Sequence, residues 1–422
     1  MNAKNSKLES FIFADLIVTV IFAVLAYGTV EPWSLALFEL NALLVAVLLA
    51  VRFTFDSQAK FGGWRMALPL LVLTGWGAIQ SVVPALSFDH QATTETTVKL
   101  LAMAIYFIAA LHTLRSSERR RKVLITLTIF GFAVSLFAII QRLTYNGKMY
   151  WVRPVSPYIA PYGPFGNYNH FAGMIELILP LPFAYLLFTR IKLEQRLLWL
   201  FSVVMMAVSV VFSLSRGGIL ALGIEVLALM LVAVLARKWN HDAAERRAMA
   251  DNKLIVGVAL TAILLLAFWI GYEPLVNRLG TLRQGSGDYS LVSRTEYWSG
   301  AWQMFSDYPL TGVGLGAFPA VYPAYGRSSV KNERLEQSHN DYLQLLTDAG
   351  LIGALIGLWF LFELIRVTRR QFQQLARARS HERALVVGGY VALLGIAVHS
   401  FLDFNLQIAA NALLFLLVVA LT

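Results

Sequence analysis

Two arginines and a histidine are the residues best suited to chemistry in this sequence, and each lies in a short polar segment between apolar runs. The first, Arg216, belongs to the segment Ser213–Gly218, just before a predicted helix that starts at about Gly217. The free N–H groups and the positive dipole end of a helix N-terminus favour an anion, and a guanidinium beside them can bind a phosphate through two hydrogen bonds. An interfacial arginine that reaches toward lipid headgroups is the alternative interpretation.

Arg294 opens the second segment, an amphipathic stretch that runs to Tyr308 and offers enough aromatic surface to order against a membrane. Its guanidinium is a second potential anion ligand, although an isolated arginine is more often a solvated charge or an ion-pair partner. The glycine-rich run Pro309–Gly316 lacks the Gly-Lys-Ser/Thr ending of a phosphate-binding loop. It therefore does not predict a nucleotide site.

His339 belongs to the third segment, Gln337–Leu346. Ser338 and Asp341 have the spacing of a helix capping box, which predicts a helix with His339 in its first turn. An imidazole titrates near neutral pH and can accept a proton from a hydroxyl group, so His339 is the candidate general base. A structural histidine at the membrane surface is the alternative.

The other polar side chains do not favour a metal site. The chain has no cysteine, and its histidines do not form a cluster with metal-ligand spacing, since His170, His339 and His399 are isolated in the sequence. Four acids lie within or near apolar runs, namely Asp15, Glu176, Glu225 and Asp403. Intramembrane acids are functional candidates by default, and for Glu176 and Glu225 we favour a structural hydrogen-bonding role.

The apolar runs that separate these segments are long enough to cross a membrane. Hydrophobic residues make up 58% of the chain and charged residues 14%, whereas a soluble domain has about a quarter of its residues charged. A helix of about twenty residues spans roughly 30 Å, the thickness of the hydrocarbon layer. We therefore expect an all-α integral membrane protein with about twelve transmembrane helices. The predicted spans are 10–30, 34–52, 65–83, 95–113, 122–143, 169–189, 196–213, 217–236, 253–271, 342–366, 384–403 and 406–422.

Basic residues alternate from one connection to the next. Lysine and arginine are concentrated in five connections, at 52–65, 115–122, 190–196, 237–247 and 366–383, whereas 29–34, 83–95 and 143–169 carry few. Because basic residues stay on the cytoplasmic side, this alternation places both termini in the cytoplasm. The net charge of +10 is thus a topology and headgroup signal, with no indication of nucleic-acid binding.

The predicted organisation has three parts. Residues 1–271 form helices one to nine and include the loop 144–169, whose Pro, Gly and Tyr content favours an ordered, irregular lid over a helix or strand. Residues 272–338 form a large loop on the non-cytoplasmic side, before the tenth helix. Residues 339–422 form helices ten to twelve. Long loops usually carry function, so we expect the site at the large loop.

Together the polar segments resemble the bacterial O-antigen ligase and O-antigen polymerase superfamily, whose members transfer polyprenyl-diphosphate-linked glycans. The motifs that carry the resemblance are Gly166–Gly173, Ser213–Gly218, Arg294 with Trp298, Pro309–Gly316, Ser338–Gln344 and His399–Asn405. They extend over residues 166–411, and their joint order is more specific than any one of them.

The resemblance implies a GT-C-like membrane glycosyltransferase with a large periplasmic loop. Arg216 and Arg294 would hold the diphosphate, and His339 would be the catalytic histidine. The further substrate-binding positions would be Asn169, His170 and Asn340. No metal or nucleotide cofactor is implied, because the polyprenyl diphosphate is already an activated leaving group. Attack opposite that group would invert the anomeric centre.

The implied location is the bacterial inner (cytoplasmic) membrane, with the active site periplasmic. The implied partners are a polyprenyl-diphosphate-linked glycan donor, a hydroxyl acceptor on lipid A core, on a second glycan or on a protein, and the lipid bilayer. These acceptors distinguish ligases, polymerases and protein glycosyltransferases, and the motifs leave the choice open, with the ligase preferred. Two hypotheses from other classes are a transporter of lipid-linked or small solutes that uses Glu176 and Glu225, and a scaffold for polysaccharide assembly.

Overall fold

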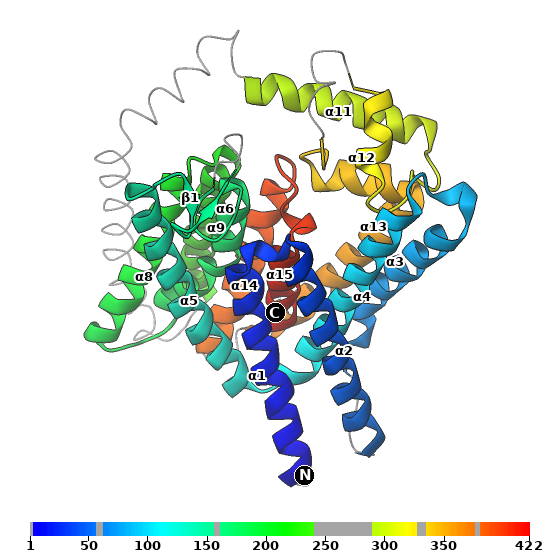
Figure 1. The fold of residues 1–422 in the computed structure, drawn as a ribbon. Coiled ribbons are helices and arrows are strands. Elements are labelled where there is room, and N and C mark those ends of the chain that lie inside the picture. The colour runs from blue at the N-terminus through cyan, green and yellow to red at the C-terminus, as the bar shows by residue number, and fades with distance from the viewer. Residues whose placement is uncertain (1–2, 56–61, 156–160, 240–288, 327–334, 376–379) are drawn as a thin grey trace.

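Long apolar helices make up most of the structure. The computed structural model describes residues 3–55, 62–155, 161–239, 289–326, 335–375 and 380–422 (Figure 1). Within these ranges nine helices are long and apolar enough to cross a membrane. The protein is therefore a nearly all-α, multi-pass membrane protein, as the hydropathy pattern predicts.

The N-terminal half contains six long helices with short 3₁₀ turns and one small β-hairpin. Its elements are α1 (Ala3–Leu25), η1 (Tyr27–Thr29), α2 (Pro32–Phe55), α3 (Trp64–Val82), η2 (Pro84–Leu86), α4 (His90–Thr113), α5 (Ser117–Leu143), β1 (Lys148–Met149), β2 (Arg153–Pro154), α6 (Tyr168–Ile178), α7 (Pro180–Phe188) and α8 (Leu193–Ser213). The elements that follow are α9 (Arg216–Trp239), α11 (Tyr289–Asp307), α12 (Phe318–Val321), η3 (Tyr322–Ala324), α13 (Asp341–Leu375), α14 (Ser380–His399), η4 (Asn405–Gln407) and α15 (Ala409–Leu421).

Two predicted spans correspond to helices that are not among the nine, and a third lies outside the described residues. The predicted span 65–83 is helix α3, which is not among the nine. The span predicted at 406–422 is shorter, because the 3₁₀ turn η4 precedes α15 and leaves a helix of 13 residues. The predicted span 253–271 and residues 272–288 of the large loop lie outside the described residues.

The predicted span 169–189 is the buried centre of the bundle. It consists of two helices, because Pro180 begins α7 directly after α6 ends at Ile178. Every residue of 169–188 is buried inside the protein, and the pair packs against α8, α14 and α15. A helix that is apolar on all sides belongs in such a position, since none of its faces needs to meet water or lipid.

The loop at 144–169 contains more regular structure than expected. Strands β1 and β2 form a short antiparallel hairpin in which Met149 pairs with Arg153, so the prediction of an irregular lid without strands is wrong for this part. Residues 156–160 lie outside the described residues.

Helix α11 lies across the end of the bundle (Figure 1). Its residues Tyr297, Ala301 and Met304 recur at helical spacing and are buried in a second, smaller apolar cluster with Phe318 and Leu343. The buried side of α11 therefore packs on the segment 313–322 and on α13. The expectation that its aromatic surface also orders against a membrane stays a prediction.

The glycine-rich run Pro309–Gly316 holds this arrangement against α13. Val313 N–H donates to Thr347 O at 2.8 Å and Gly314 N–H to Asp348 O at 3.0 Å. This contact lies beside a kink in α13 at Gly350, which has φ +60°. The run thus has a structural role in the fold.

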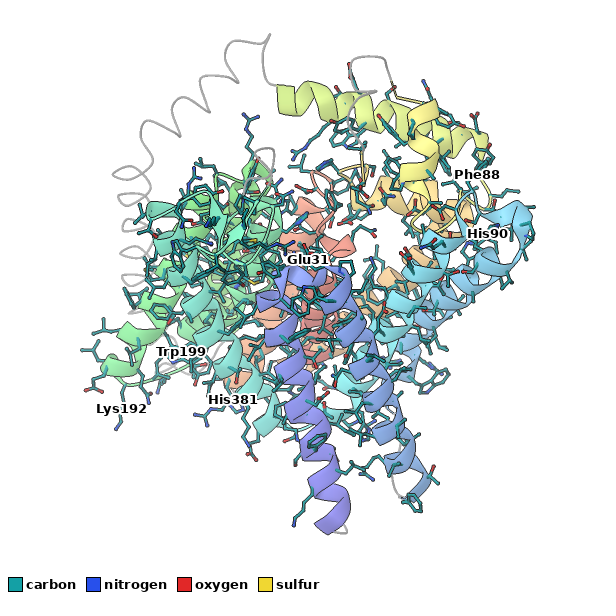
Figure 2. All side chains as sticks on the ribbon, in the orientation of Figure 1. Glu31, Phe88, His90, Lys192, Trp199 and His381 are labelled. Atoms are coloured by element: carbon teal, nitrogen blue, oxygen red, sulfur yellow. The ribbon has the colours of Figure 1, made fainter. Side chains whose placement is uncertain are left out.

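The two kinds of connection lie at opposite ends of the bundle. Figure 2 shows Lys192 and His381, from two of the basic connections, at one end, and Phe88 and His90, from a connection poor in basic residues, at the other. Helix α11 lies at the end that carries Phe88 and His90. The alternation predicted from the basic residues is therefore present in the fold.

Candidate functional site

The start of α13 positions the segment that carries His339. Asn340 is the residue that caps this helix, because its Oδ1 accepts hydrogen bonds from two backbone N–H groups of the first turn, each at 3.0 Å. Ser338 Oγ instead donates to Asn340 O at 3.0 Å. The predicted capping box of Ser338 and Asp341 is therefore wrong, and His339 precedes the helix.

His339 adopts a left-handed backbone conformation, with φ +54°. Such a conformation costs a residue with a side chain about 1–3 kcal/mol, so the surroundings must impose it. Two hydrogen bonds to the segment after α14 do so. Asp341 N–H donates to Ser400 O at 2.9 Å, and Asn340 Nδ2 donates to Phe401 O at 3.2 Å.

Asp403 is the centre of the site. It follows the end of α14, is fully buried, and has one carboxylate oxygen, Oδ1, 3.2 Å from His339 Nδ1. The other oxygen, Oδ2, lies 3.6 Å from Arg294 Nη2, and His170 Nε2 lies 4.0 Å from Oδ1. Burial raises the pKa of Asp403, but the hydrogen bond with His339 and the positive charges around it outweigh burial and hold that pKa below its usual range. Asp403 is therefore a carboxylate at neutral pH.

The carboxylate decides which nitrogen of His339 can act as a base. A carboxylate accepts hydrogen bonds only, so Nδ1 of His339 carries a proton, and the neutral form of the imidazole has its lone pair on Nε2. Two aromatic rings hold the imidazole in place, since Phe404 packs edge-on at 4.8 Å between ring centroids and Tyr297 stacks at 6.0 Å. The histidine is thus fixed in one tautomer and one orientation.

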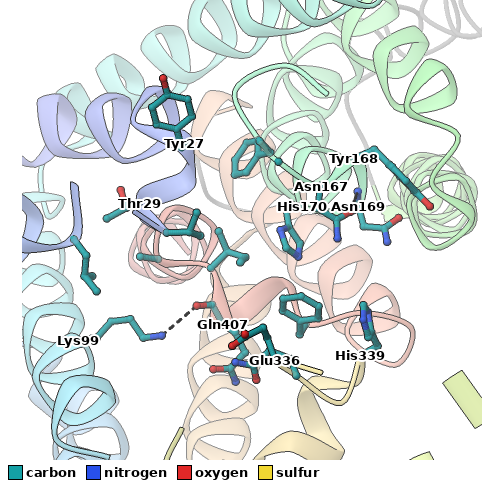
Figure 3. Close-up of a pocket in the computed structure, with 18 of the residues that line it drawn as sticks. Tyr27, Thr29, Lys99, Asn167, Tyr168, Asn169, His170, Glu336, His339 and Gln407 are labelled. Atoms are coloured by element: carbon teal, nitrogen blue, oxygen red, sulfur yellow. Dashed lines mark hydrogen bonds between the residues drawn. The ribbon is translucent and has the colours of Figure 1, made fainter. Parts of the chain in front are cut away.

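His339 and Arg294 line a cavity of about 810 Å³, together with the predicted residues Asn169 and His170. Figure 3 labels His339, Asn169 and His170 in this lining. The opposite part of the lining is apolar and comes from the start of α2 and of α15, with Leu35, Ile408 and Ala409 among its residues. One cavity therefore combines a cluster of ionisable side chains with an apolar surface that a lipid chain could contact.

Lys99 on α4 adds a cation to this cavity that sequence reasoning missed. Its Nζ donates to Gln407 O at 3.3 Å, as Figure 3 shows. The residue falls inside the predicted span 95–113 and was counted as part of an apolar run. The signal that could have identified it is a lysine within a hydrophobic helix, which is rare unless the residue has a function.

Arg216 is the first residue of α9 and is not among the residues that line the cavity. The helix begins as predicted, with Ser215 Oγ accepting from Gly218 N–H at 3.1 Å. A Cβ at Gly217 would lie 2.5 Å from the ring of His399, so only glycine allows this close approach. The start of α9 therefore packs directly on α14, one turn before Asp403.

His399 has its own buried carboxylate partner. Its Nδ1 lies 3.0 Å from both oxygens of Glu176 on α6. The three histidines that are isolated in the sequence thus gather in the fold, two of them around Asp403. Glu176 has the hydrogen-bonding role we expected. Asp15 is also bonded in the core, since it accepts from Asn41 Nδ2 at 3.0 Å.

The fold therefore brings four of the six predicted site residues to one cavity, namely His339, Arg294, His170 and Asn169. Asn340 lies next to the cavity and caps α13, and Arg216 lies at the start of α9. In the sequence, Asp403 is one of four acids within or near apolar runs and part of the motif His399–Asn405, and its role is visible only in the tertiary structure. Within the described residues, no group of three or more metal-binding side chains has a geometry that could hold an ion.

A comparison with protein families matches the middle of the chain, a range that does not include Asp403, His170 or Asn169. Residues 172–358 match the family model described as O-antigen ligase. This match confirms the resemblance to the O-antigen ligase and polymerase superfamily, and the matched range contains Arg216, Arg294 and His339. No curated protein sequence matches the chain.

Proposed function

Because residues 172–358 form a domain of the O-antigen ligase family, we propose that the protein is a glycosyltransferase acting at the periplasmic face of the inner membrane. It moves a glycan from a polyprenyl diphosphate carrier to an acceptor hydroxyl, as in the ligation of O-antigen to lipid A core. A polymerase, whose acceptor is a second lipid-linked glycan, is the alternative within the family.

The contact of Asp403 with His339 is the observation that carries this proposal. A buried carboxylate that holds Nδ1 of a histidine leaves Nε2 as a base and stabilises the imidazolium once Nε2 accepts a proton. A histidine with a purely structural role at a membrane surface requires neither a buried carboxylate bonded to its ring nor a left-handed backbone conformation. Both features favour a base that works at the wall of the cavity.

The reaction balances with these groups. Nε2 of His339 takes the proton of the acceptor hydroxyl as that oxygen attacks the anomeric carbon of the donor sugar. The bond between this carbon and the diphosphate oxygen breaks, and its electron pair leaves with the diphosphate. Because the attacking oxygen and the leaving group are on opposite sides of the carbon, the anomeric centre is inverted.

Negative charge accumulates on the departing diphosphate, and cations in the cavity would stabilise it. Arg294 and Lys99 both line the cavity and lie on different elements, α11 and α4. Arg216 does not line the cavity, and its contribution of a third cation and a helix dipole from the N-terminus of α9 stays a prediction from the sequence. Charge that develops in the transition state is stabilised most by such preorganised groups, which do not have to reorganise during the reaction.

The shape of the cavity suits a lipid-linked donor. The apolar side chains Leu35, Ile408 and Ala409 line one part of it, whereas His339 and Arg294 lie in the other. A polyprenyl chain would lie along the first part with its diphosphate at the second. No cofactor is needed, because cleavage of the diphosphate ester drives the transfer.

The proposal is tested with purified protein in lipid nanodiscs, supplied with a polyprenyl-diphosphate-linked glycan. Three acceptors are offered separately: lipid A core, a second lipid-linked glycan, and a protein with surface hydroxyl groups. We expect a glycosylated product with lipid A core, and none from His339→Ala under the same conditions. If the wild-type protein forms no product with any acceptor, the proposed function is wrong, and product only with the second glycan assigns a polymerase.

A transporter is the candidate function from another class, and one observation favours it. The central pair α6 and α7 is interrupted at Leu179, and Glu176 and Glu225 are buried nearby. Interrupted helices with buried acids occur at the substrate sites of transporters. Movement of the lipid-linked glycan across a vesicle membrane without any transfer product would support this function instead.

A further inference from the structure

A second hollow lies on the other side of α11 from the cavity. It is an open groove of about 630 Å³ between α11 and the first turns of α13. Its lining residues are Thr295, Trp298, Ser299, Trp302, Gln303, Asn340, Tyr342, Leu343 and Leu346. None of the functions discussed above uses this groove.

Adjacent residues of the same segments line the groove and the cavity. Arg294, Tyr297 and His339 line the cavity, whereas the residues that follow each of them in the chain, Thr295, Trp298 and Asn340, line the groove. The two hollows therefore adjoin each other along α11 and at the segment that carries His339.

The chemistry of the two hollows differs. The cavity is lined by Lys99, Arg294, His170, His339 and Glu336, whereas every residue that lines the groove is uncharged. A diphosphate belongs in the first environment. The groove offers hydroxyl and amide groups together with aromatic rings, so it fits a ligand that is rich in hydroxyl groups and carries little charge.

Three aromatic side chains define the surface of the groove. Trp302 is 56% exposed and Tyr342 is 42% exposed, so both rings are open to a ligand in the groove. The indole Nε1 of Trp298 is buried and has no hydrogen-bond partner among the described residues. An unpaired buried N–H is costly, and a ligand hydroxyl would satisfy it.

We propose that this groove binds the sugar residues of the acceptor glycan, next to the hydroxyl that attacks. This inference rests on the proposed function and adds the place of the second substrate. The C–H face of a sugar ring packs flat on an exposed indole. The hydroxyl groups of the sugar can form hydrogen bonds with the side chains of Ser299, Thr295 and Gln303 and with the indole N–H of Trp298. The attacking sugar itself would reach into the cavity, so that its hydroxyl lies between Nε2 of His339 and the anomeric carbon of the donor.

A lipid chain is the competing occupant, because tryptophan and tyrosine also anchor proteins at membrane interfaces. The polar side chains of Ser299 and Gln303 favour the sugar, since a hydrocarbon chain offers them no hydrogen-bonding group. Substitutions at Trp302 separate the two occupants. Phenylalanine keeps a flat ring on which a sugar can pack, whereas leucine keeps only the apolar volume that a lipid chain would contact.

The experiment measures steady-state transfer to lipid A core by the full chain in nanodiscs. For Trp302→Ala we expect the acceptor KM to rise roughly tenfold, with kcat and the donor KM unchanged. Trp302→Phe should recover most of the loss and Trp302→Leu little of it. Gln303→Ala, on the exposed side of the same groove, should raise the acceptor KM by a smaller factor. The control is Trp64→Ala, at an exposed tryptophan at the start of α3 outside both the groove and the cavity, which should behave as wild type.

A competition assay gives an independent measure. The sugar portion of lipid A core, released from its lipid by mild acid, should inhibit the wild-type protein competitively with the acceptor and inhibit Trp302→Ala much less. An unchanged acceptor KM in Trp302→Ala, or full recovery in Trp302→Leu, would overturn the groove assignment. Either result leaves the proposed function intact as long as the wild type transfers glycan, so the two failures are distinguishable.

Discussion

Nδ1 of His339 lies 3.2 Å from Oδ1 of Asp403, and the two residues are 64 positions apart in the chain. Asp403 is fully buried, and Arg294 lies 3.6 Å from its other oxygen. The carboxylate therefore joins the candidate base to a candidate phosphate ligand. This arrangement couples the proton transfer of the proposed reaction to the position of its leaving group, and the predictions below follow from it.

Removal of the His339 imidazole should slow the transfer step and leave binding of the donor unchanged. His339→Ala should lower kcat by about 100- to 10,000-fold, the usual contribution of a general base. It should also flatten the acidic limb of the pH–rate profile, because neutral imidazole is the active form. The control is His90→Ala, at a histidine that bonds to Ser81 O and is remote from the cavity. Lost donor binding with an unchanged pH profile would make His339 a positioning residue.

Asp403→Asn keeps the shape of the side chain and removes its charge. We expect kcat to fall by about 100- to 10,000-fold, because the amide no longer selects the tautomer of His339 or stabilises its imidazolium. The measurement is kcat for transfer to lipid A core, compared with Asn41→Ala, which disrupts a buried contact on α2. Wild-type kcat in Asp403→Asn would show that the carboxylate only supports the fold.

The lowered pKa of Asp403 also predicts how stability depends on pH. A carboxyl group whose folded pKa lies below its ordinary value of 3.8 stabilises the fold at all pH values above that, and the stabilisation is lost as pH falls through the folded pKa. The difference in melting temperature between wild type and Asp403→Asn should therefore stay constant from about pH 8 to pH 5 and shrink only in stronger acid. Thermal melts in detergent across this range measure it, and a difference that already disappears near pH 6 would contradict the assigned charge.

The two arginines should act mainly on the transition state. Arg294→Ala and Arg216→Ala should each lower kcat/KM by about 100- to 1000-fold. Lysine at either position should recover only part of the loss, because a point charge does not reproduce a forked contact with phosphate. Arg142→Ala, at an exposed arginine at the end of α5, is the matched control. Full recovery by lysine would indicate simple charge attraction without a forked contact.

The close approach of α9 to α14 gives a test of Arg216 that leaves the arginine in place. A methyl group at Gly217 would lie 2.5 Å from the ring of His399, whereas a methyl group at Gly223 on the same helix would meet nothing within 4 Å. Gly217→Ala should displace the start of α9 and lower kcat/KM by up to about 100-fold. Gly223→Ala should leave kcat/KM unchanged. Equal behaviour of the two variants would show that the position of this helix end does not matter for the reaction.

The proposed charge stabilisation comes from side chains, so chelators should not affect it. We expect transfer in EDTA at the same rate as without it, measured after prior dialysis against the chelator. A loss of activity that a divalent ion restores would contradict this prediction and would direct attention to the acids and histidines around Asp403.

The sequence by itself determined the membrane class, the positions of most helices and the identity of His339 and Arg294 as candidates. Hydropathy over about twenty residues and the alternation of basic connections are local properties, and the bilayer imposes them on each segment separately. Local sequence patterns predicted the ends of helices less accurately than their positions. The cap of α13 proved to be Asn340, because several polar side chains near a helix start compete for the same N–H groups and tertiary contacts decide among them.

Only the tertiary structure decided which polar groups act together. Lys99 reaches Gln407 across 308 positions and His399 reaches Glu176 across 223, and no periodicity within one segment encodes such pairs. Burial inside the bundle makes unpaired charge costly, so ionisable groups on different helices meet each other. The same packing of α11 on α13 separates the charged cavity from the uncharged groove. The side chains that could bind and react are thus visible in the sequence, whereas their partners depend on how the helices pack.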